Sequence, residues 1–268
     1  MPAWTTGYLN SLRDRFDTAT AGLSDRLDAV ADGRVAPAID DIAIGSGRSL
    51  RAAALFFDIR GFTARTSSPL PQDLKRTLLM LDCVIPMVMG VIHDHGGYVE
   101  KNTGDGVMGI IGAEGSDRTA AKESLDAALT IFYALSHVVN PFLANLGIPA
   151  VDARIGIDIG NLLLARIGAP TGGARQSRNF LTAVGPAANI ASRLQQLAGT
   201  NEILVGDLVW RNARPERQGS FAVATPPGWT WVHLGTTDPY WVWRFTETRR
   251  YPLDGLGLLA GLLSGRNR

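Results

Sequence analysis

The sequence predicts an α+β fold: a ferredoxin-like βααββαβ core with a mostly antiparallel sheet and helices on one face. Two observations carry this prediction. Short apolar runs are joined by tight turns, as where Tyr98-Val99 and Val107-Met108 flank Gly104-Asp105-Gly106, which is typical of a hairpin. Long apolar stretches with helical spacing lie before and after this hairpin, so the elements follow the order of that core.

In the first half of the core, the apolar run Ala52–Phe57 predicts a buried strand that stops at Asp58, where a glycine turn follows. A loop comes next, and then an apolar helix from Asp73 to His93. Pro86 lies inside that helix and is expected to kink it or split it in two, because proline lacks the N–H that the helix needs. The hairpin around Asp105 follows.

The second half begins with a helix from Ser116 to Leu146, which capping-type residues open. Clean alternation of apolar residues over Asp152–Gly168 predicts a strand that forms half of a hairpin. A short strand is expected at Phe180–Val184, followed by a helix at Gly185–Ala198. Another strand is expected at Glu202–Val205, and an aromatic-rich final strand at Trp229–Phe245.

We expect three parts: an N-terminal helical segment at 1–45, the core domain at 46–248 and an apolar C-terminal tail at 249–268. The apolar stripe of the N-terminal segment suits either packing on its own domain or pairing with its copy in a dimer. The run Leu253–Leu263 is far shorter than the ~20 residues that span a bilayer. We expect this run to dock on the domain or to be disordered. The alternatives are contact with a partner or with a membrane surface.

Composition excludes several classes of protein. The 268 residues include 26 Lys and Arg against 25 Asp and Glu, which gives no electrostatic basis for binding nucleic acid or an anionic membrane. The single cysteine, Cys83, lies in an apolar stretch, which excludes a disulfide scaffold and is typical of a buried, inert thiol. The N-terminus lacks a basic region followed by an apolar one, so we expect a cytoplasmic protein without a transmembrane segment.

Two aspartates are the candidate metal ligands. Asp58 and Asp105 each stand at the end of a predicted strand, so both carboxylates lie at one end of one sheet if the two strands are neighbours. Carboxylates that converge in this way hold Mg²⁺ or Mn²⁺ against a phosphate chain, which suggests phosphoryl or nucleotidyl chemistry. The alternative for each is a solvated turn aspartate, although the glycines beside Asp105 let a phosphate approach the backbone.

A second group of candidates stands on the helix after Gly185. Asn189 and Arg193 are four residues apart and project from one face, among small neighbours that permit a close approach. An amide beside a guanidinium suits a transferring phosphoryl group, and the alternative is an exposed polar face. Lys101 and Thr182 are weaker candidates for contacts with a base.

Three motifs occur together in the order and at the separations of a known family. They are Phe-x-Asp-Ile-x-Gly-Phe-Thr at 56–63, Lys-x-x-Gly-Asp-Gly-x-Met at 101–108 and Gly-x-x-x-Asn-x-Ala-x-Arg at 185–193. Over about residues 50–210 the chain resembles the class III nucleotide cyclases, the family of adenylate and guanylate cyclase catalytic domains.

The resemblance implies a nucleotidyl cyclase, a phosphorus-oxygen lyase. Such an enzyme makes a 3′,5′-cyclic nucleotide and pyrophosphate by in-line attack of the ribose 3′-oxygen on the α-phosphorus. It also implies two Mg²⁺ or Mn²⁺ ions per site and a head-to-tail homodimer with composite sites, so that a monomer should be inactive. The residues it assigns are Asp58, Ile59 and Asp105 to the metals, Lys101, Thr182, Phe62 and Thr63 to the substrate, and Asn189 and Arg193 to catalysis.

The sequence departs from the family pattern near its end. The family usually shows Leu-Lys-Gly there, with the lysine on the triphosphate, whereas residues 232–236 read Val-His-Leu-Gly-Thr. Either His233, an arginine of the Arg175–Arg178 loop or another group replaces that lysine, or triphosphate binding differs.

The resemblance leaves the base open. Lys101 with Thr182 is similar to the pair that many bacterial adenylate cyclases use, which favours ATP. The absence of a sensor domain, the lead-in before Asp58 and the Trp-rich end are more similar to the pyrimidine cyclases of bacterial antiphage (Pycsar) signalling. The balance favours UTP or CTP, with a separate effector protein that reads cyclic UMP or cyclic CMP. A catalytically silent fold that only binds nucleotide or dimerises is the alternative from a different class.

Overall fold

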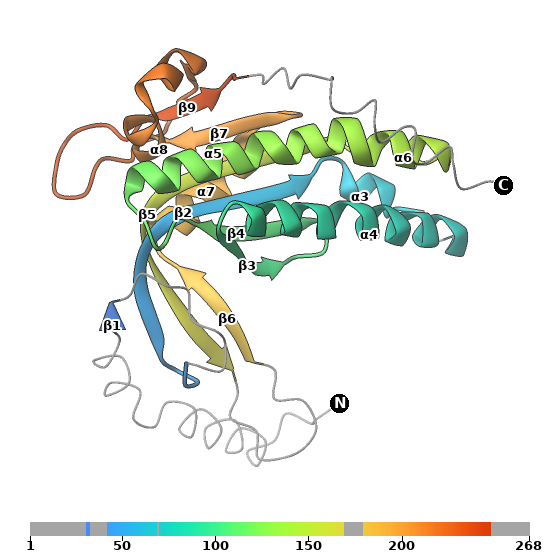
Figure 1. The fold of residues 1–268 in the computed structure, drawn as a ribbon, viewed down its shortest axis with the longest axis horizontal. Coiled ribbons are helices and arrows are strands. Elements are labelled where there is room, and N and C mark those ends of the chain that lie inside the picture. The colour runs from blue at the N-terminus through green and yellow to red at the C-terminus, as the bar shows by residue number, and fades with distance from the viewer. Residues whose placement is uncertain (1–30, 33–41, 69, 169–178, 248–268) are drawn as a thin grey trace.

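The structure is a computed structural model that describes residues 31–32, 42–68, 70–168 and 179–247. Figure 1 shows one twisted sheet with helices packed against it. The predicted N-terminal helix lies outside the described residues, apart from the two-residue strand β1 (Ala31–Asp32). The predicted C-terminal tail lies outside them as well.

The elements follow the predicted order. The first half of the core consists of β2 (Gly47–Ile59), α3 (Phe62–Arg65), α4 (Pro71–Asp94), β3 (Gly97–Asn102) and β4 (Gly106–Ile111). The middle consists of α5 (Asp117–Ala134), a π-helical turn (Leu135–Val139), α6 (Asn140–Asn145), β5 (Ala153–Gly168) and β6 (Asn179–Val184). The end consists of α7 (Pro186–Leu197), β7 (Glu202–Gly206), α8 (Asp207–Asn212), a 3₁₀ turn (Pro215–Ser220), β8 (Phe221–Val223) and β9 (Val242–Phe245).

The described strands form one sheet in the order β3-β4-β2-β5-β7-β9-β8, with β1 pairing to β2 and β6 to β5. The central strands β2 and β5 run antiparallel along the whole of β2. Among the described ladders, β1–β2 and β5–β7 are parallel and the others are antiparallel. The predicted α+β class with a mostly antiparallel sheet is confirmed.

Helices cover both faces of the sheet, so the expectation that they cover one face is wrong. Leu55 and Phe57 of β2 face the layer of α4 and α5, while Ala54 faces α7 on the other side. Close packing explains the second layer, because Gly156 of β5 lies directly against the backbone of α7 at Ala191. This second layer presents the predicted Asn189 and Arg193.

Pro86 was expected to kink α4 or to split it in two; the helix is continuous through Pro86, so a split is wrong. Proline removes one hydrogen bond from the helix. Val84, Ile85 and Val88 beside it are buried against the sheet, and their packing holds the helix together at this point.

The C-terminal region differs most from its prediction. A strand over Trp229–Phe245 is wrong except at Val242–Phe245, and the short strand β8 was missed. The preceding residues form a loop that an isolated bridge between Val232 and Pro239 closes. Glycine and proline explain why these residues form a loop and not a strand. Gly235 has a φ of 76°, which is typical of a turn, and a proline has no backbone N–H to donate to the hydrogen bonds of a sheet.

Two stretches, Pro71–Asp94 and Asp117–Asn145, are long and apolar enough to cross a membrane by length and composition alone. Buried core helices of globular domains meet the same criteria. Both stretches pack on the sheet, and Val84 of the first and Leu125 of the second are fully buried in the same core. Their apolar residues are therefore explained by the fold.

Candidate active site

The two predicted metal aspartates lie at the same end of the sheet. Asp58 on β2 pairs with Gly106, the residue that follows Asp105. The backbone N–H of Ile59 donates to the carbonyl oxygen of Asp105 at 3.1 Å, which fixes the hairpin tip against the end of β2. Partial burial, together with the negative charge of Asp58, raises the pKa of the Asp105 carboxyl. The structure thus brings the two carboxylates together.

This pair fits a divalent cation. Two hard carboxylates that repel each other in a partly buried place are stabilised by Mg²⁺ or Mn²⁺, which prefer oxygen ligands. A side chain at Gly106 would approach Thr103 Oγ1 to 2.7 Å and Asp58 Oδ1 to 3.5 Å, so glycine keeps the space beside the carboxylate open. The side chain of Ile59 is aliphatic and carries no ligand atom, so only its backbone carbonyl could serve as a metal ligand, and the residue as a whole is 2% exposed.

Arg154 belongs to this group, and the sequence did not indicate it. It stands on β5 in register with Asp58, and its Nε and Nη2 atoms both lie 2.8 Å from Asp58 Oδ2. Its Nη1 atom donates to the carbonyl oxygen of Gln196 on α7 at 3.1 Å. A guanidinium therefore supplies positive charge at the carboxylate that was predicted to hold a metal.

The two residues predicted to touch substrate after Asp58 lie on the short helix α3. Gly61 precedes it with a φ of 69°, a conformation that favours glycine and turns the chain directly after β2. The ring of Phe62 packs partly against the core, whereas Thr63 is exposed. Of the two side chains, only that of Thr63 is fully open to a ligand.

Lys101 lies on β3 and Thr182 on β6, two strands that do not pair with each other in the sheet. A residue that the sequence did not indicate connects these two strands. The carboxylate of Glu100 on β3 is fully buried and accepts a hydrogen bond from the backbone N–H of Ala183 on β6 at 2.7 Å. The Nζ atom of Lys101 lies 3.4 Å from Glu100 Oε2. Glu100 therefore links Lys101 to the strand of Thr182.

Asn189 and Arg193 lie on the outer side of α7, and both are exposed. Their neighbours Ala188 and Ile190 are buried, so the sheet side and the open side of the helix are distinct. Among the described residues, no hydrogen bond or ion pair connects Asn189 or Arg193 with Asp58 or Asp105. The two halves of the predicted site are therefore not joined within one chain.

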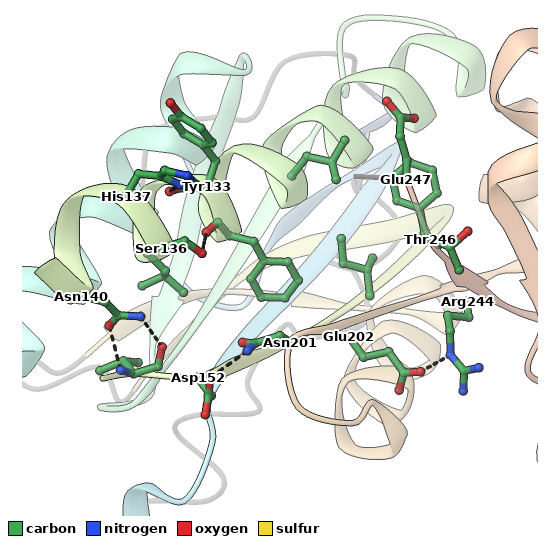
Figure 2. Close-up of a pocket in the computed structure, with 16 residues that line it drawn as sticks. Tyr133, Ser136, His137, Asn140, Asp152, Asn201, Glu202, Arg244, Thr246 and Glu247 are labelled. Atoms are coloured by element: carbon green, nitrogen blue, oxygen red, sulfur yellow. Dashed lines mark hydrogen bonds and ion pairs between the residues drawn. The ribbon is translucent and has the colours of Figure 1, made fainter. Parts of the chain in front are cut away.

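A cavity of about 540 Å³ lies elsewhere, between the end of α5 and β9 (Figure 2). None of the predicted site residues lines it. The candidate site is therefore separate from this cavity.

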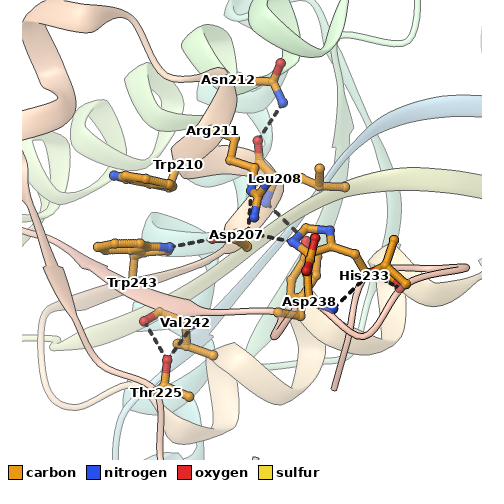
Figure 3. Close-up of polar contacts among 12 residues, drawn as sticks. Asp207, Leu208, Trp210, Arg211, Asn212, Thr225, His233, Asp238, Val242 and Trp243 are labelled. Carbon is orange, nitrogen blue, oxygen red and sulfur yellow. Dashed lines mark hydrogen bonds and ion pairs between the residues drawn. The ribbon is translucent and has the colours of Figure 1, made fainter. Parts of the chain in front are cut away.

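His233 does not face the aspartate pair. Figure 3 shows its ring against Asp207, with Nε2 2.6 Å from Asp207 Oδ2. The fully buried Asp207 carboxylate also accepts hydrogen bonds from Arg211 Nε at 2.6 Å and Trp243 Nε1 at 3.0 Å. These contacts fasten the 229–240 loop to α8 and argue against His233 as the replacement for the missing lysine. The Arg175–Arg178 loop lies outside the described residues.

Asp158 gives a prediction about stability. It is buried on β5 and accepts a hydrogen bond from the Tyr240 hydroxyl at 2.6 Å. Burial raises its pKa from 3.8 to about 8, so the folded chain keeps a proton that the unfolded chain loses. The stability from this group is fully present below the unfolded pKa and is lost as the pH rises toward 8, by up to about 1.4 kcal/mol per pH unit.

The Asp158→Asn variant cannot ionise at this position. The free energy of unfolding of this variant, measured with urea, is therefore expected to increase relative to that of the wild type as the pH rises from 5 to 8. A difference between the two proteins that stays constant with pH would contradict a protonated Asp158.

Known proteins show the same fold and motifs. The chain matches the family described as the adenylate and guanylate cyclase catalytic domain over residues 46–225. An adenylate cyclase of Anabaena cylindrica is 29% identical over 65% of the chain and 33% of its own length. An adenylate cyclase of Mycobacterium bovis is 30% identical over 62% of the chain and 34% of its own length. The chain thus spans about a third of the length of these relatives.

Solved structures agree on the fold. The guanylyl cyclase Cya2 has a TM-score of 0.60 at 22% identity, over 76% of this chain and 95% of its own. The adenylyl cyclase CyaB from P. aeruginosa has a TM-score of 0.60 at 21% identity, over 76% and 98%. The family match covers well over half of the chain and includes all three motifs. The chain therefore belongs to the adenylate and guanylate cyclase catalytic domain family, the class III nucleotide cyclases, whose members act on nucleoside triphosphates with divalent metal ions.

Proposed function

We propose that this protein converts ATP to 3′,5′-cyclic AMP and pyrophosphate at composite sites of a head-to-tail homodimer in the cytoplasm. The observation that carries the proposal is the pairing of Asp58 and Asp105 at one end of the sheet, while Asn189 and Arg193 are exposed on α7 of the same chain. A second copy, turned by a two-fold axis, would bring its α7 to the first copy's aspartates and complete both sites.

The aspartates would hold the metals. Asp58 and Asp105, with the backbone carbonyl of Ile59, would bind two Mg²⁺ or Mn²⁺ ions. When bound, these ions activate the ribose 3′-hydroxyl and neutralise the triphosphate. Two residues at the turn into α3 would contact the phosphate chain, Phe62 through its backbone and Thr63 through its hydroxyl.

Arg154 would compensate for the missing lysine. Its guanidinium neutralises Asp58 in this structure, so divalent ions at Asp58 would compete with it and release it. A released guanidinium beside the aspartates can donate two hydrogen bonds to triphosphate oxygens. Arg154 thereby takes the part that the family usually gives to a lysine near residues 232–236.

The partner subunit would supply the groups that act on the transition state. The guanidinium of Arg193 would neutralise charge on the oxygens of the five-coordinate phosphorus, and the amide of Asn189 would orient the ribose. Because these donors are already placed before reaction, catalysis needs no covalent nucleophile.

The Lys101 and Thr182 pair supports adenine as the base. Lysine can donate to the adenine N1 atom, and the threonine hydroxyl can accept from the N6 amino group. The relatives described above are adenylate cyclases. Pyrimidines are the second candidate, because cytosine presents the same acceptor and donor at N3 and N4, and uracil O4 accepts from lysine. Cyclic UMP or cyclic CMP would then be a messenger to a separate effector protein in antiphage defence.

The test is to incubate purified protein with Mn²⁺ and each of ATP, GTP, CTP and UTP separately, and to identify products by mass spectrometry. Cyclic AMP is expected as the dominant product, and the Asp105→Ala variant should give none. A dominant cyclic UMP or cyclic CMP would replace ATP with a pyrimidine substrate. No product with any nucleotide would contradict the proposal and favour the silent fold.

The role of Arg154 gives a separate prediction. Replacing it with alanine should lower kcat/KM for the triphosphate by about 10- to 100-fold, the usual value of a charge-assisted hydrogen bond. Mn²⁺ binding without nucleotide, measured by calorimetry, should become tighter in the same variant because Asp58 loses its competitor. A variant that binds Mn²⁺ more weakly, or keeps its kcat/KM, would contradict this role.

A further inference from the structure

The cavity in Figure 2 is an apolar space at the point where the described chain ends. Its apolar lining includes Phe132 of α5, Leu135 of the π-helical turn and Phe245 of β9. Thr246 and Glu247, the last described residues, also line it. The chain therefore continues beyond Glu247 from the edge of a cavity of about 540 Å³.

The polar side chains of the cavity wall already have partners within the fold. Asn140 makes two hydrogen bonds with the backbone of Val151, at 2.8 and 3.1 Å. Asp152 accepts from Asn201 at 2.7 Å, and Glu202 pairs with Arg244. These groups do not call for a polar ligand, so an apolar occupant suits the cavity better.

The helix beside the cavity is apolar on two sides. One row of side chains, spaced four residues apart, is buried in the core, and it consists of Leu135, Val139 and Leu143. A second row with the same spacing is 49%, 51% and 42% exposed, and it consists of Val138, Phe142 and Leu146. None of these three side chains lines the cavity, so this second row lies on another side of the helix.

The sequence beyond Glu247 contains an element of matching chemistry and length. Leu253–Leu263 holds six leucines in 11 residues with one charged residue, Asp254. The intervening residues can span at most about 20 Å. Eleven residues in a helical conformation rise about 17 Å, and the cavity wall from Phe132 to Asn140 rises about 12 Å.

We propose that Leu253–Leu263 docks on its own domain, with leucines in the cavity against Phe132, Leu135 and Phe245. Docking there would also support the residues that lead into β5, because Val151 and Asp152 line the same cavity. Arg154, which pairs with Asp58, follows two residues later. The tail would thus stabilise the strand end that carries the candidate active site.

Disulfide trapping in the full chain tests this proposal. In a Cys83→Ala background, Ser136→Cys at the cavity is combined with Leu259→Cys in the tail. Mild oxidation at low protein concentration should form a disulfide within one chain at least about tenfold faster than in a control pair, because docking raises the local concentration of the two thiols. The control combines Leu259→Cys with Asp94→Cys, an exposed site beside the opposite edge strand β3.

Equal rates for the two pairs would overturn the proposal. Disulfides formed only between two chains would overturn it in favour of a second copy as the occupant. A second measurement avoids disulfide geometry: Ser136→Cys, an exposed position at the cavity, is labelled with a maleimide in the full chain and in a chain that also carries Leu256→Ser, Leu259→Ser and Leu263→Ser. Labelling should be at least about tenfold faster when the leucines are removed, and an unchanged rate would contradict docking.

The same labelling in the presence of phosphatidylglycerol vesicles tests a membrane as the occupant. Protection of Ser136→Cys that requires vesicles would overturn docking within one chain. Protection without vesicles supports it. These readouts do not use nucleotide turnover, so they are independent of the proposed cyclase activity.

Discussion

Replacing Asp105 with asparagine is expected to reduce cyclase activity by about 1,000-fold at saturating ATP and Mn²⁺. Asparagine keeps the size and the position at the hairpin tip but removes the charge that would hold the metals. Metal stabilisation of the transition state contributes several kcal/mol, which corresponds to a rate factor of this size. Initial rates of cyclic AMP and pyrophosphate formation measure the loss.

The control for this variant is Asp94→Asn, which removes an exposed aspartate at the end of α4. It should leave the rate unchanged. Thermal unfolding should show that both variants are folded, and Asp105→Asn should be at least as stable as the wild type, because it removes the repulsion from Asp58. Retention of more than a tenth of the wild-type rate by Asp105→Asn would show that the aspartate pair is not the metal site.

The Arg193→Ala variant is expected to lose about 100- to 1,000-fold in kcat with a small change in KM. The guanidinium acts on charge that develops in the transition state, and the loss of one such donor has an effect of this size. Arg193 is exposed on α7, so its removal should not affect folding. Arg76→Ala on α4 is the matched control, since it also removes an exposed arginine. An Arg193→Ala enzyme with unchanged kcat would contradict its assignment.

Local sequence signals were sufficient for the residues that stand at the ends of elements. Asp58 and Asp105 were found because an apolar run stops at one and glycines surround the other. Asn189 and Arg193 were found because their spacing fits one face of a helix that does form. Ser116 opens its helix as predicted, with its hydroxyl accepting from the backbone N–H of Thr119 at 3.2 Å.

Residues whose roles depend on strand register were not predictable in this way. Arg154 meets Asp58 across 96 positions of sequence, and Glu100 meets Ala183 across 83. Nothing in the neighbouring sequence of either residue indicates its partner. A register argument for β2 and β5 would have been needed, and one residue of slip would turn Arg154 to the other face.

The wrong predictions share a physical cause, which is that tertiary packing overrides local preference. Buried neighbours keep α4 intact at Pro86. The aromatic residues before Val242 suggested a strand, but contacts such as Trp229 Nε1 to the carbonyl oxygen of Tyr240, at 2.7 Å, stabilise a loop instead. The close approach of β5 and α7 at Gly156 placed a helix on the face that was expected to be bare.

The most direct test of the composite site is complementation between Asp105→Asn and Arg193→Ala. The two variants are co-expressed with different tags, and the mixed dimers are purified through both tags. Each variant alone should be nearly inactive, because every site of either homodimer lacks one component. A mixed dimer has one site with both lesions and one intact site, so it should show about half of the wild-type rate per dimer. Purified mixed dimers that remain as inactive as the parents would contradict a site shared between two subunits.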